Sequence, residues 1–224
     1  MSLFEDLKTA IGADWTDYTE HSFVQQLGAG TLPLSAFQDY LVQDYLFLVQ
    51  FARAYALAGF KSKSLSDLEF ANAGMTSILT ETQLHRRLTE RWGISPLALE
   101  DAPEKLATVA YTRYVLDCGM SGSLLDLNVA LAPCMIGYSE IGRALEPLRI
   151  ASPDHPYGEW SSEYSAPDYA LAASAAASRL GDLAGGGLSA QRFDELVTIF
   201  RTATRLESAF WQQALEVAPA PVHS

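Results

Sequence analysis

The sequence predicts an all-α protein, a single-domain bundle of about seven long helices. Apolar residues recur at three- and four-residue spacing along nearly the whole chain, which is the period of an amphipathic helix. No segment shows the two-residue alternation of a half-buried strand. Of the 224 residues 49% are hydrophobic, and single domains reach roughly 250 residues. One sizeable core is therefore expected.

Start and stop signals divide the chain into helices. Capping-box patterns at 35–38 and 66–69 predict two helix starts. Gly93 and the glycines at 185–187 predict helix ends, and a short turn is expected near 95–96. The predicted helices, with boundaries good to about 2–4 residues, are 3–22, 34–60, 66–92, 103–120, 122–148, 157–183 and 189–217. The domain should span 1–217, with a flexible tail at 218–224.

Composition excludes several kinds of partner. A formal charge of −12 and a pI near 4.6 oppose binding to nucleic acid or to an anionic membrane surface. No apolar run approaches the roughly 20 residues that span a bilayer. Acidic residues stand near the N-terminus where a targeting peptide would carry only basic ones. We expect a cytoplasmic protein whose two cysteines, Cys118 and Cys134, are reduced thiols.

Polar residues interrupt the apolar faces of three predicted helices. Asp44 takes a core position in 34–60, and Glu207 takes one in 189–217. In 122–148, Cys134 and Tyr138 lie one turn apart on the inward face. An isolated buried carboxylate costs several kcal/mol unless it is paired, hydrogen-bonded or protonated. Alone, each acid is best explained by a buried hydrogen bond to a Tyr or Arg of a neighbouring helix, but the two together beside an inward thiol predict a small-molecule site.

Cys134 follows a proline, which gives it a distinctive setting. Free cysteine usually acts as a small buried hydrophobe. Pro133 should kink or restart the helix, and after a restart Cys134 would lie in a first turn, where the helix dipole favours a thiolate. Tyr138 could then hold the sulfur by a hydrogen bond.

Neighbouring residues suggest two other readings, a metal site and an aromatic pocket. Glu81 and His85 share a helix face at a spacing that could form half of a metal site. No second such pair exists, so we interpret them as a structural pair and expect no metal and no cofactor. Aromatic residues are frequent near the polar positions. Most of them are expected to lie in the core, although a flat ligand could stack on them.

Five segments in order resemble the TenA/thiaminase II family. They are HSFVQQLGAGTLPLSAFQDYLVQDYLFLVQFARAYALA, AYTRYVLDCG, LNVALAPCMIGYSEIG, HPYGEWSSEYSAPDY and RLESAFWQQAL. The resemblance covers nearly the whole chain and implies a haem-oxygenase-like bundle that forms a homotetramer. It also implies salvage of the pyrimidine half of thiamin.

The resemblance assigns roles to individual residues. Cys134 matches the nucleophile and Tyr138 its partner, which indicates the cysteine-bearing branch. Asp44 matches the acid that binds the aminopyrimidine, and Glu207 matches the acid on the opposite side. The pocket positions match Phe47, Tyr111, Tyr164 and Phe210. Phe47 stands where some members have Tyr, which removes one possible hydrogen bond.

These residue types suit a hydrolysis in which water replaces a group on an exocyclic methylene. The implied substrate is 4-amino-5-aminomethyl-2-methylpyrimidine or thiamin. A thiolate from Cys134 adds to the ring carbon next to N1, while Glu207 protonates N1. Asp44 binds the amino edge, and burial can raise a carboxyl pKa by up to about 3–5 units, so a protonated form is expected. The two acids could exchange roles.

Two alternatives stay open. One is another enzyme on the same fold, such as a di-iron oxidase or an enzyme of quinone or haem metabolism. The other is a non-catalytic protein that binds a pyrimidine without turnover.

Overall fold

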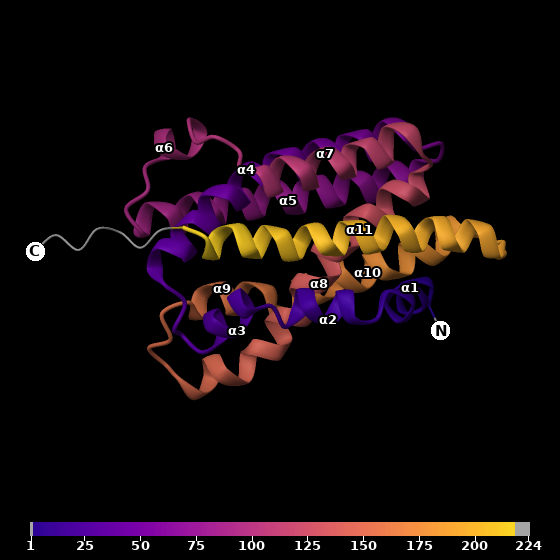
Figure 1. The fold of residues 1–224 in the computed structure, drawn as a ribbon. Coiled ribbons are helices and arrows are strands. Elements are labelled where there is room, and N and C mark those ends of the chain that lie inside the picture. The colour runs from indigo at the N-terminus through magenta and orange to yellow at the C-terminus, as the bar shows by residue number, and fades with distance from the viewer. Residues whose placement is uncertain (1, 218–224) are drawn as a thin grey trace, which may run out of the picture. The chain divides into compact units, whose positions relative to one another are not determined.

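A computed structural model describes residues 2–217, apart from the side chains of Leu84 and Leu88. The predicted tail at 218–224 lies outside the described residues. Within them the structure is all-α, without a strand, which confirms the predicted fold class (Figure 1). The helices are α1 (Leu3–Ile11), α2 (Ala13–Thr19), α3 (Ser22–Gly28), α4 (Leu34–Lys61), α5 (Leu65–Arg91), α6 (Pro96–Glu100), α7 (Leu106–Ser121), α8 (Leu124–Ala151), α9 (Gly158–Tyr164), α10 (Pro167–Ala184) and α11 (Ala190–Leu215).

Two predicted helices are wrong because short breaks divide them. The segment 3–22 forms α1, α2 and the start of α3, since Gly12 adopts a φ of 52°, a conformation that ends a helix. The segment 157–183 forms α9 and α10, because Pro167 begins a new helix and Ala166 before it is extended. The other long helices lie within a few residues of the predicted bounds.

Helix α8 runs through Pro133 without a restart, so of the predicted kink or restart the restart is wrong. The helix begins at Leu124 and ends at Ala151. By length and composition it could cross a membrane, but 89% of its most apolar window is buried inside the protein. This burial is what a core helix of a soluble fold shows as well.

The predicted helix starts are also displaced. At α4 the N-cap is Pro33, and no side chain caps the first turn, so the box at 35–38 is wrong. At α5 the hydroxyl of Ser64 accepts from the backbone N–H of Asp67, two residues before the predicted cap. The end signals are confirmed: Gly93 has a φ of 81° and Gly185 a φ of 65°.

The described residues form two compact units. The first unit contains residues 2–32 and 128–211, and the second contains 33–127 and 212–217. In the second unit α4 packs along both α5 and α7 (Figure 1). In the first unit α1 packs on α2 and α10. There the Glu140 carboxylate of α8 accepts from Trp15 Nε1 at 3.0 Å and from Lys8 Nζ at 2.8 Å.

Candidate functional site

All eight residues predicted for the site are buried, although they belong to different units. The second unit holds Asp44, Phe47 and Tyr111. The first unit holds the other five, which are Cys134, Tyr138, Tyr164, Glu207 and Phe210.

In the second unit two side chains hold one oxygen of Asp44. Tyr40, one turn earlier in α4, donates its hydroxyl to Asp44 Oδ2 at 3.2 Å. Nε2 of His85, in α5, lies 3.1 Å from the same oxygen. Burial lowers the pKa of His85 to about 4. The imidazole is therefore neutral at pH 7, and its contact with Asp44 is a hydrogen bond between buried groups.

Aromatic rings adjoin this acid along α4. Phe47, three residues beyond Asp44, packs on Tyr111 of α7 with ring centroids 5.1 Å apart. Phe47 also stacks on Phe51, at 4.7 Å. Phe47 and Tyr111 thus meet where α4 packs on α7, whereas Asp44 contacts a different helix, α5, through His85.

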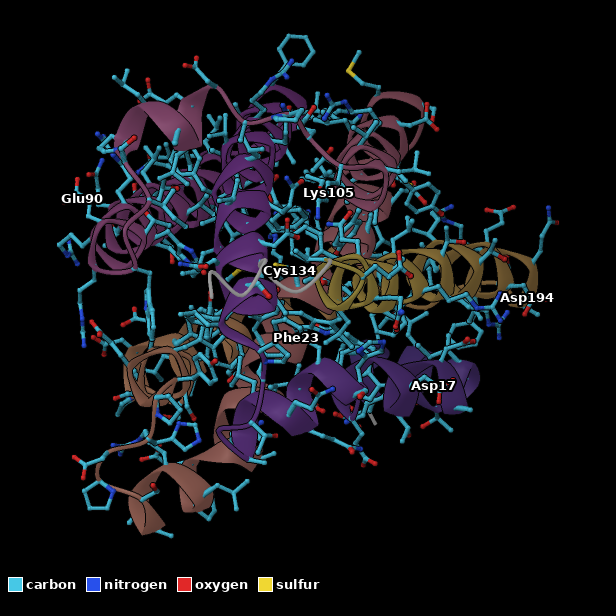
Figure 2. The ribbon with its side chains drawn as sticks, turned by 60° about the vertical axis from the view of Figure 1, so that its left-hand side comes forward. Asp17, Phe23, Glu90, Lys105, Cys134 and Asp194 are labelled. Carbon is cyan, nitrogen blue, oxygen red and sulfur yellow. The ribbon has the colours of Figure 1, made fainter. Side chains whose placement is uncertain are left out.

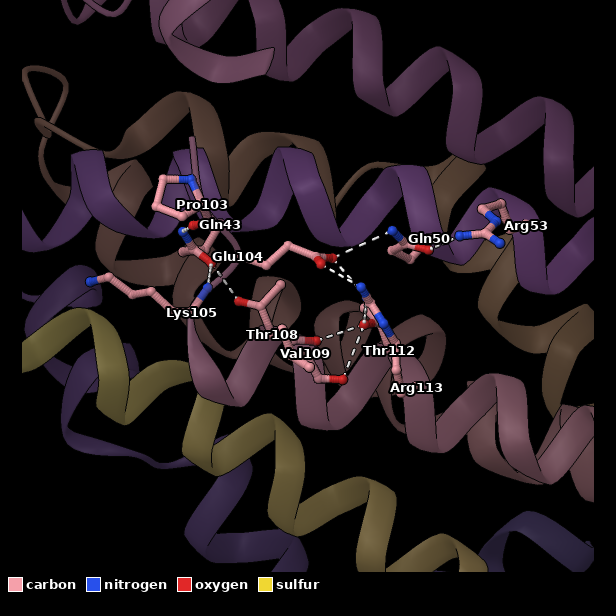
Figure 3. A network of polar contacts seen from close by, with 10 residues as sticks. All are labelled: Gln43, Gln50, Arg53, Pro103, Glu104, Lys105, Thr108, Val109, Thr112 and Arg113. Atoms are coloured by element: carbon pink, nitrogen blue, oxygen red, sulfur yellow. Dashed lines mark hydrogen bonds and ion pairs between the residues drawn. The ribbon is translucent and has the colours of Figure 1, made fainter. Parts of the chain in front are cut away.

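A buried amide next to Asp44 fixes α7 against α4. Gln43 donates to the carbonyl of Pro103 and accepts from the backbone N–H of Lys105 and the hydroxyl of Thr108 (Figure 3). Gln213, near the end of α11, donates to the same hydroxyl at 2.9 Å. These bonds satisfy buried polar atoms around the first turn of α7. They therefore fix the helix that carries Tyr111.

In the first unit, Cys134 (labelled in Figure 2) and Tyr138 are buried residues of α8, and Tyr138 lies in a cluster of aromatic rings. The ring of Tyr138 lies 4.9 Å from Tyr164 of α9 and 5.2 Å from Trp211 of α11, measured between centroids. Trp160 of α9 packs on Tyr164 at 4.5 Å. Tyr138 and Tyr164, both of which the family resemblance assigns to the site, thus contact each other.

Two glycines of α8 allow neighbouring helices to pack closely against it. A Cβ added at Gly137 would lie 2.3 Å from the ring of Tyr18, whose hydroxyl donates to the carbonyl of Pro133 at 3.2 Å. A Cβ at Gly142 would lie 2.4 Å from the backbone carbon of Tyr164. Close approach of α2 and α9 to α8 therefore depends on the missing side chains.

Glu207 and Phe210 follow one face of α11. Both are about 1% exposed, and Trp211 of the aromatic cluster lies one turn after Glu207. The rings of Phe210 and Trp211 are 6.4 Å apart. The helical stripe thus predicts correctly that an acid and its neighbouring aromatic residues lie in the core.

The expected activation of Cys134 by a helix terminus is wrong. Cys134 stands ten residues after Leu124, the first residue of α8. The dipole effect falls off within the first turn of a helix. The continuous helix leaves Tyr138, one turn on, as the predicted partner of the sulfur.

Tyr40 and His85, which contact Asp44, were not predicted from the sequence as parts of the site. Tyr40 had a signal, because it precedes Asp44 by one helical turn. His85 was interpreted only as the partner of Glu81, and its contact with Asp44 joins two helices, so helical spacing could not reveal it. Within residues 2–217, no group of three or more His, Cys, Asp or Glu side chains could hold a metal ion.

Comparison with known proteins places this bundle in a fold class. A solved structure from Shewanella denitrificans, described as a domain of unknown function with a heme oxygenase-like fold, superposes with a TM-score of 0.70 at 12% identity, over 94% of this chain and 91% of that chain. The chain thus has a haem-oxygenase-like fold.

The family follows from closer matches. Residues 10–217 match the TENA/THI-4/PQQC family, and the chain belongs to it. A TenA family transcription regulator from Silicibacter sp. TM1040 is 42% identical, with a TM-score of 0.90 over 96% of this chain and 97% of that chain. The aminopyrimidine aminohydrolase of Halalkalibacterium halodurans is 40% identical over 89% of each chain.

Proposed function

We propose that this chain is an enzyme that hydrolyses thiamin-related pyrimidines to hydroxymethylpyrimidine, in the salvage of thiamin. Its substrate is 4-amino-5-aminomethyl-2-methylpyrimidine, which loses ammonia, or thiamin, which loses its thiazole. The observation that carries the proposal is the 40% identity to an aminopyrimidine aminohydrolase over 89% of both chains. The burial of the predicted acids and thiol supports it.

Cys134 acts as the nucleophile in this proposal. Direct displacement at the methylene is slow, so the thiolate first adds to the ring carbon next to N1 and breaks aromaticity. The lone pair of the enamine nitrogen then expels the leaving group, which departs as neutral ammonia from the protonated aminomethyl group or as neutral thiazole from thiamin. Water adds to the methylene, and the thiol is eliminated. Tyr138 stabilises the thiolate by a hydrogen bond from its hydroxyl.

The two acids act on opposite edges of the same ring. Glu207 donates the proton that N1 needs when the sulfur adds. Asp44 binds the edge that carries the amino group and N3. The assignment of both acids to one substrate molecule rests on the family resemblance.

The aromatic residues receive the flat faces of the ring. Phe47 and Tyr111, which pack on each other, form one stacking surface, and Tyr164 and Phe210 lie in the aromatic cluster around Tyr138 and Trp211. A dry aromatic site strengthens the electrostatic steps, because water does not screen the reacting charges.

The direct test is a product assay. The purified protein is incubated separately with the aminomethylpyrimidine and with thiamin, and hydroxymethylpyrimidine is measured. We expect turnover of at least one substrate. Binding without turnover would instead indicate a non-catalytic pyrimidine-binding protein, and stoichiometric iron in the purified protein would favour an oxidase on the same fold.

The proposal extends to assembly and location. As the family resemblance implies, we expect a homotetramer, and we expect the protein in the cytoplasm, with neither a nucleic acid nor a membrane as partner. The net charge of −12 supports the expectation that neither a nucleic acid nor a membrane is a partner. Light scattering on the purified protein measures the number of subunits, and a stable monomer would contradict the tetramer.

A further inference from the structure

The environment of Asp44 is built from side chains on two helices. Oδ2 of Asp44 lies 3.1 Å from Nε2 of His85 and 3.2 Å from the hydroxyl of Tyr40. All three residues are at least 98% buried. Two polar partners on one carboxyl oxygen, this deep in the protein, are a specific arrangement, since buried polar groups are costly unless they are hydrogen-bonded.

The protonation state of His85 limits what this contact can be. Because burial lowers the pKa of His85 to about 4, the ring carries one proton at pH 7 and is neutral. Two arrangements are possible. In one, Nε2 carries the proton and donates it to Oδ2 of Asp44. In the other, Nε2 accepts a hydrogen bond, which requires that Oδ2 is protonated. The Tyr40 hydroxyl already donates to Oδ2. An oxygen that accepts this bond is the poorer place for the carboxyl's own proton, so the Nε2–H form of His85 is favoured.

We propose that His85 is a positioning residue that, as the Nε2–H tautomer, works with Tyr40 to fix Oδ2 of Asp44 as a hydrogen-bond acceptor. When the carboxyl is protonated, its proton is then on Oδ1. Oδ1 donates to N3 of the aminopyrimidine, which is an acceptor. This inference rests on the proposed function, because it gives the atom by which Asp44 recognises that substrate.

The inference predicts a specific pattern of kinetic effects. A residue that orients the acid contacting the ring acts on substrate and transition state alike, so its loss should raise KM more than it lowers kcat. His85→Leu removes the donor and keeps an apolar side chain of similar bulk. We expect kcat/KM to fall by about 10- to 100-fold, as for the loss of a hydrogen bond to a charged or strongly polar group.

A conservative variant separates positioning from packing. His85→Gln keeps a side-chain N–H at nearly the reach of Nε2 and should restore kcat/KM to within a few-fold of the wild type. His21→Asn is the matched control: His21 caps α3, where its Nδ1 accepts from the Phe23 N–H, and Asn is a good N-cap. This control should leave both kinetic constants unchanged. Circular dichroism checks that every variant is folded.

The proton itself is observed by ¹⁵N NMR of the wild type, with the His85 signals assigned by their loss in His85→Gln. We expect the shifts of a neutral ring protonated at Nε2 at pH 7. An Nδ1–H ring, an imidazolium, or an His85→Gln variant as impaired as His85→Leu would overturn the inference. If the wild type turns over neither pyrimidine, the proposed function fails, and the tautomer measurement still decides the position of the proton.

Discussion

The surroundings of Asp44 and of Cys134 differ in kind. Asp44 lies among hydrogen-bonding partners, with His85 and Tyr40 on its carboxyl and the Gln43 network beside it. Cys134 lies one turn from Tyr138, which is surrounded by aromatic rings. The first arrangement suits recognition of polar edges, and the second suits a covalent step that is shielded from bulk solvent. In the proposed enzyme, substitutions of the site residues in the second unit should therefore act on KM, and substitutions of Cys134 and its partner Tyr138 in the first unit on kcat.

The largest effect is expected from Cys134→Ser. Loss of the nucleophile should lower kcat at least about 1000-fold while substrate binding is largely retained, because a serine hydroxyl is not ionised at neutral pH. Kinetics with calorimetric binding measure the two quantities. Cys118→Ser is the matched control, since both thiols are 7% exposed and Cys118 lies elsewhere in the fold. Equal loss in both variants would contradict the assigned role.

Acidic pH should lower the free energy of unfolding through protonation of His85. Its pKa falls from 6.5 in the unfolded chain to about 4 in the folded protein, so between these values the unfolded state binds more protons. The contribution of His85 is present above pH 6.5 and is lost as pH falls toward 4, by roughly 3 kcal/mol.

Urea unfolding at pH 7 and at pH 4 measures this loss. The difference in the free energy of unfolding between wild type and His85→Gln should shrink in acid by that amount. A difference that does not change with pH would show that folding leaves the pKa of His85 unshifted, and would contradict its burial as a neutral ring.

The aromatic region is vulnerable to added volume. Gly142→Ala places a Cβ 2.4 Å from the Tyr164 backbone, where no flexible side chain can move aside, and should cost about 1–3 kcal/mol of stability. In Gly181→Ala, within α10, the new Cβ meets nothing within 4 Å. That variant should instead gain up to about 1 kcal/mol from helix propensity. Thermal unfolding of both variants checks the contrast, and equal shifts would contradict close packing of α9 on α8.

The smallest effect is expected at the outer end of the network beside Asp44. Arg113 pairs with Glu104, and this ion pair lowers the pKa of the Glu104 carboxyl (Figure 3). The guanidinium side chain is 47% exposed, and exposed pairs contribute about 0.2–1 kcal/mol. Glu104→Gln should therefore change stability within that range and leave KM unchanged. A large rise in KM would show that the pair supports the recognition region.

The sequence predicted the fold class and the core positions better than the contacts. Long stripes at helical spacing predict α4, α8 and α11, and the polar residues interrupting them are buried as expected. The breaks at Gly12 and Pro167 were missed, because apolar spacing continues across a short break in a helix.

Tertiary contacts account for what sequence reasoning missed at the site. No local sequence pattern around Asp44 indicates its contact with His85, which lies 41 residues later in the sequence. Likewise, the sequence identifies Gly137 and Gly142 only as weak helix formers. Their role, which is to leave room for Tyr18 and Tyr164, depends on tertiary contacts.

The most direct test is a crystal structure of the Cys134→Ser variant with the aminomethylpyrimidine bound. The account predicts one ring with Oδ1 of Asp44 at N3 and Glu207 at N1. It also places the oxygen that replaces the sulfur in van der Waals contact with the ring carbon beside N1. A pyrimidine bound away from Asp44, or with position 134 out of reach of the ring, would contradict it.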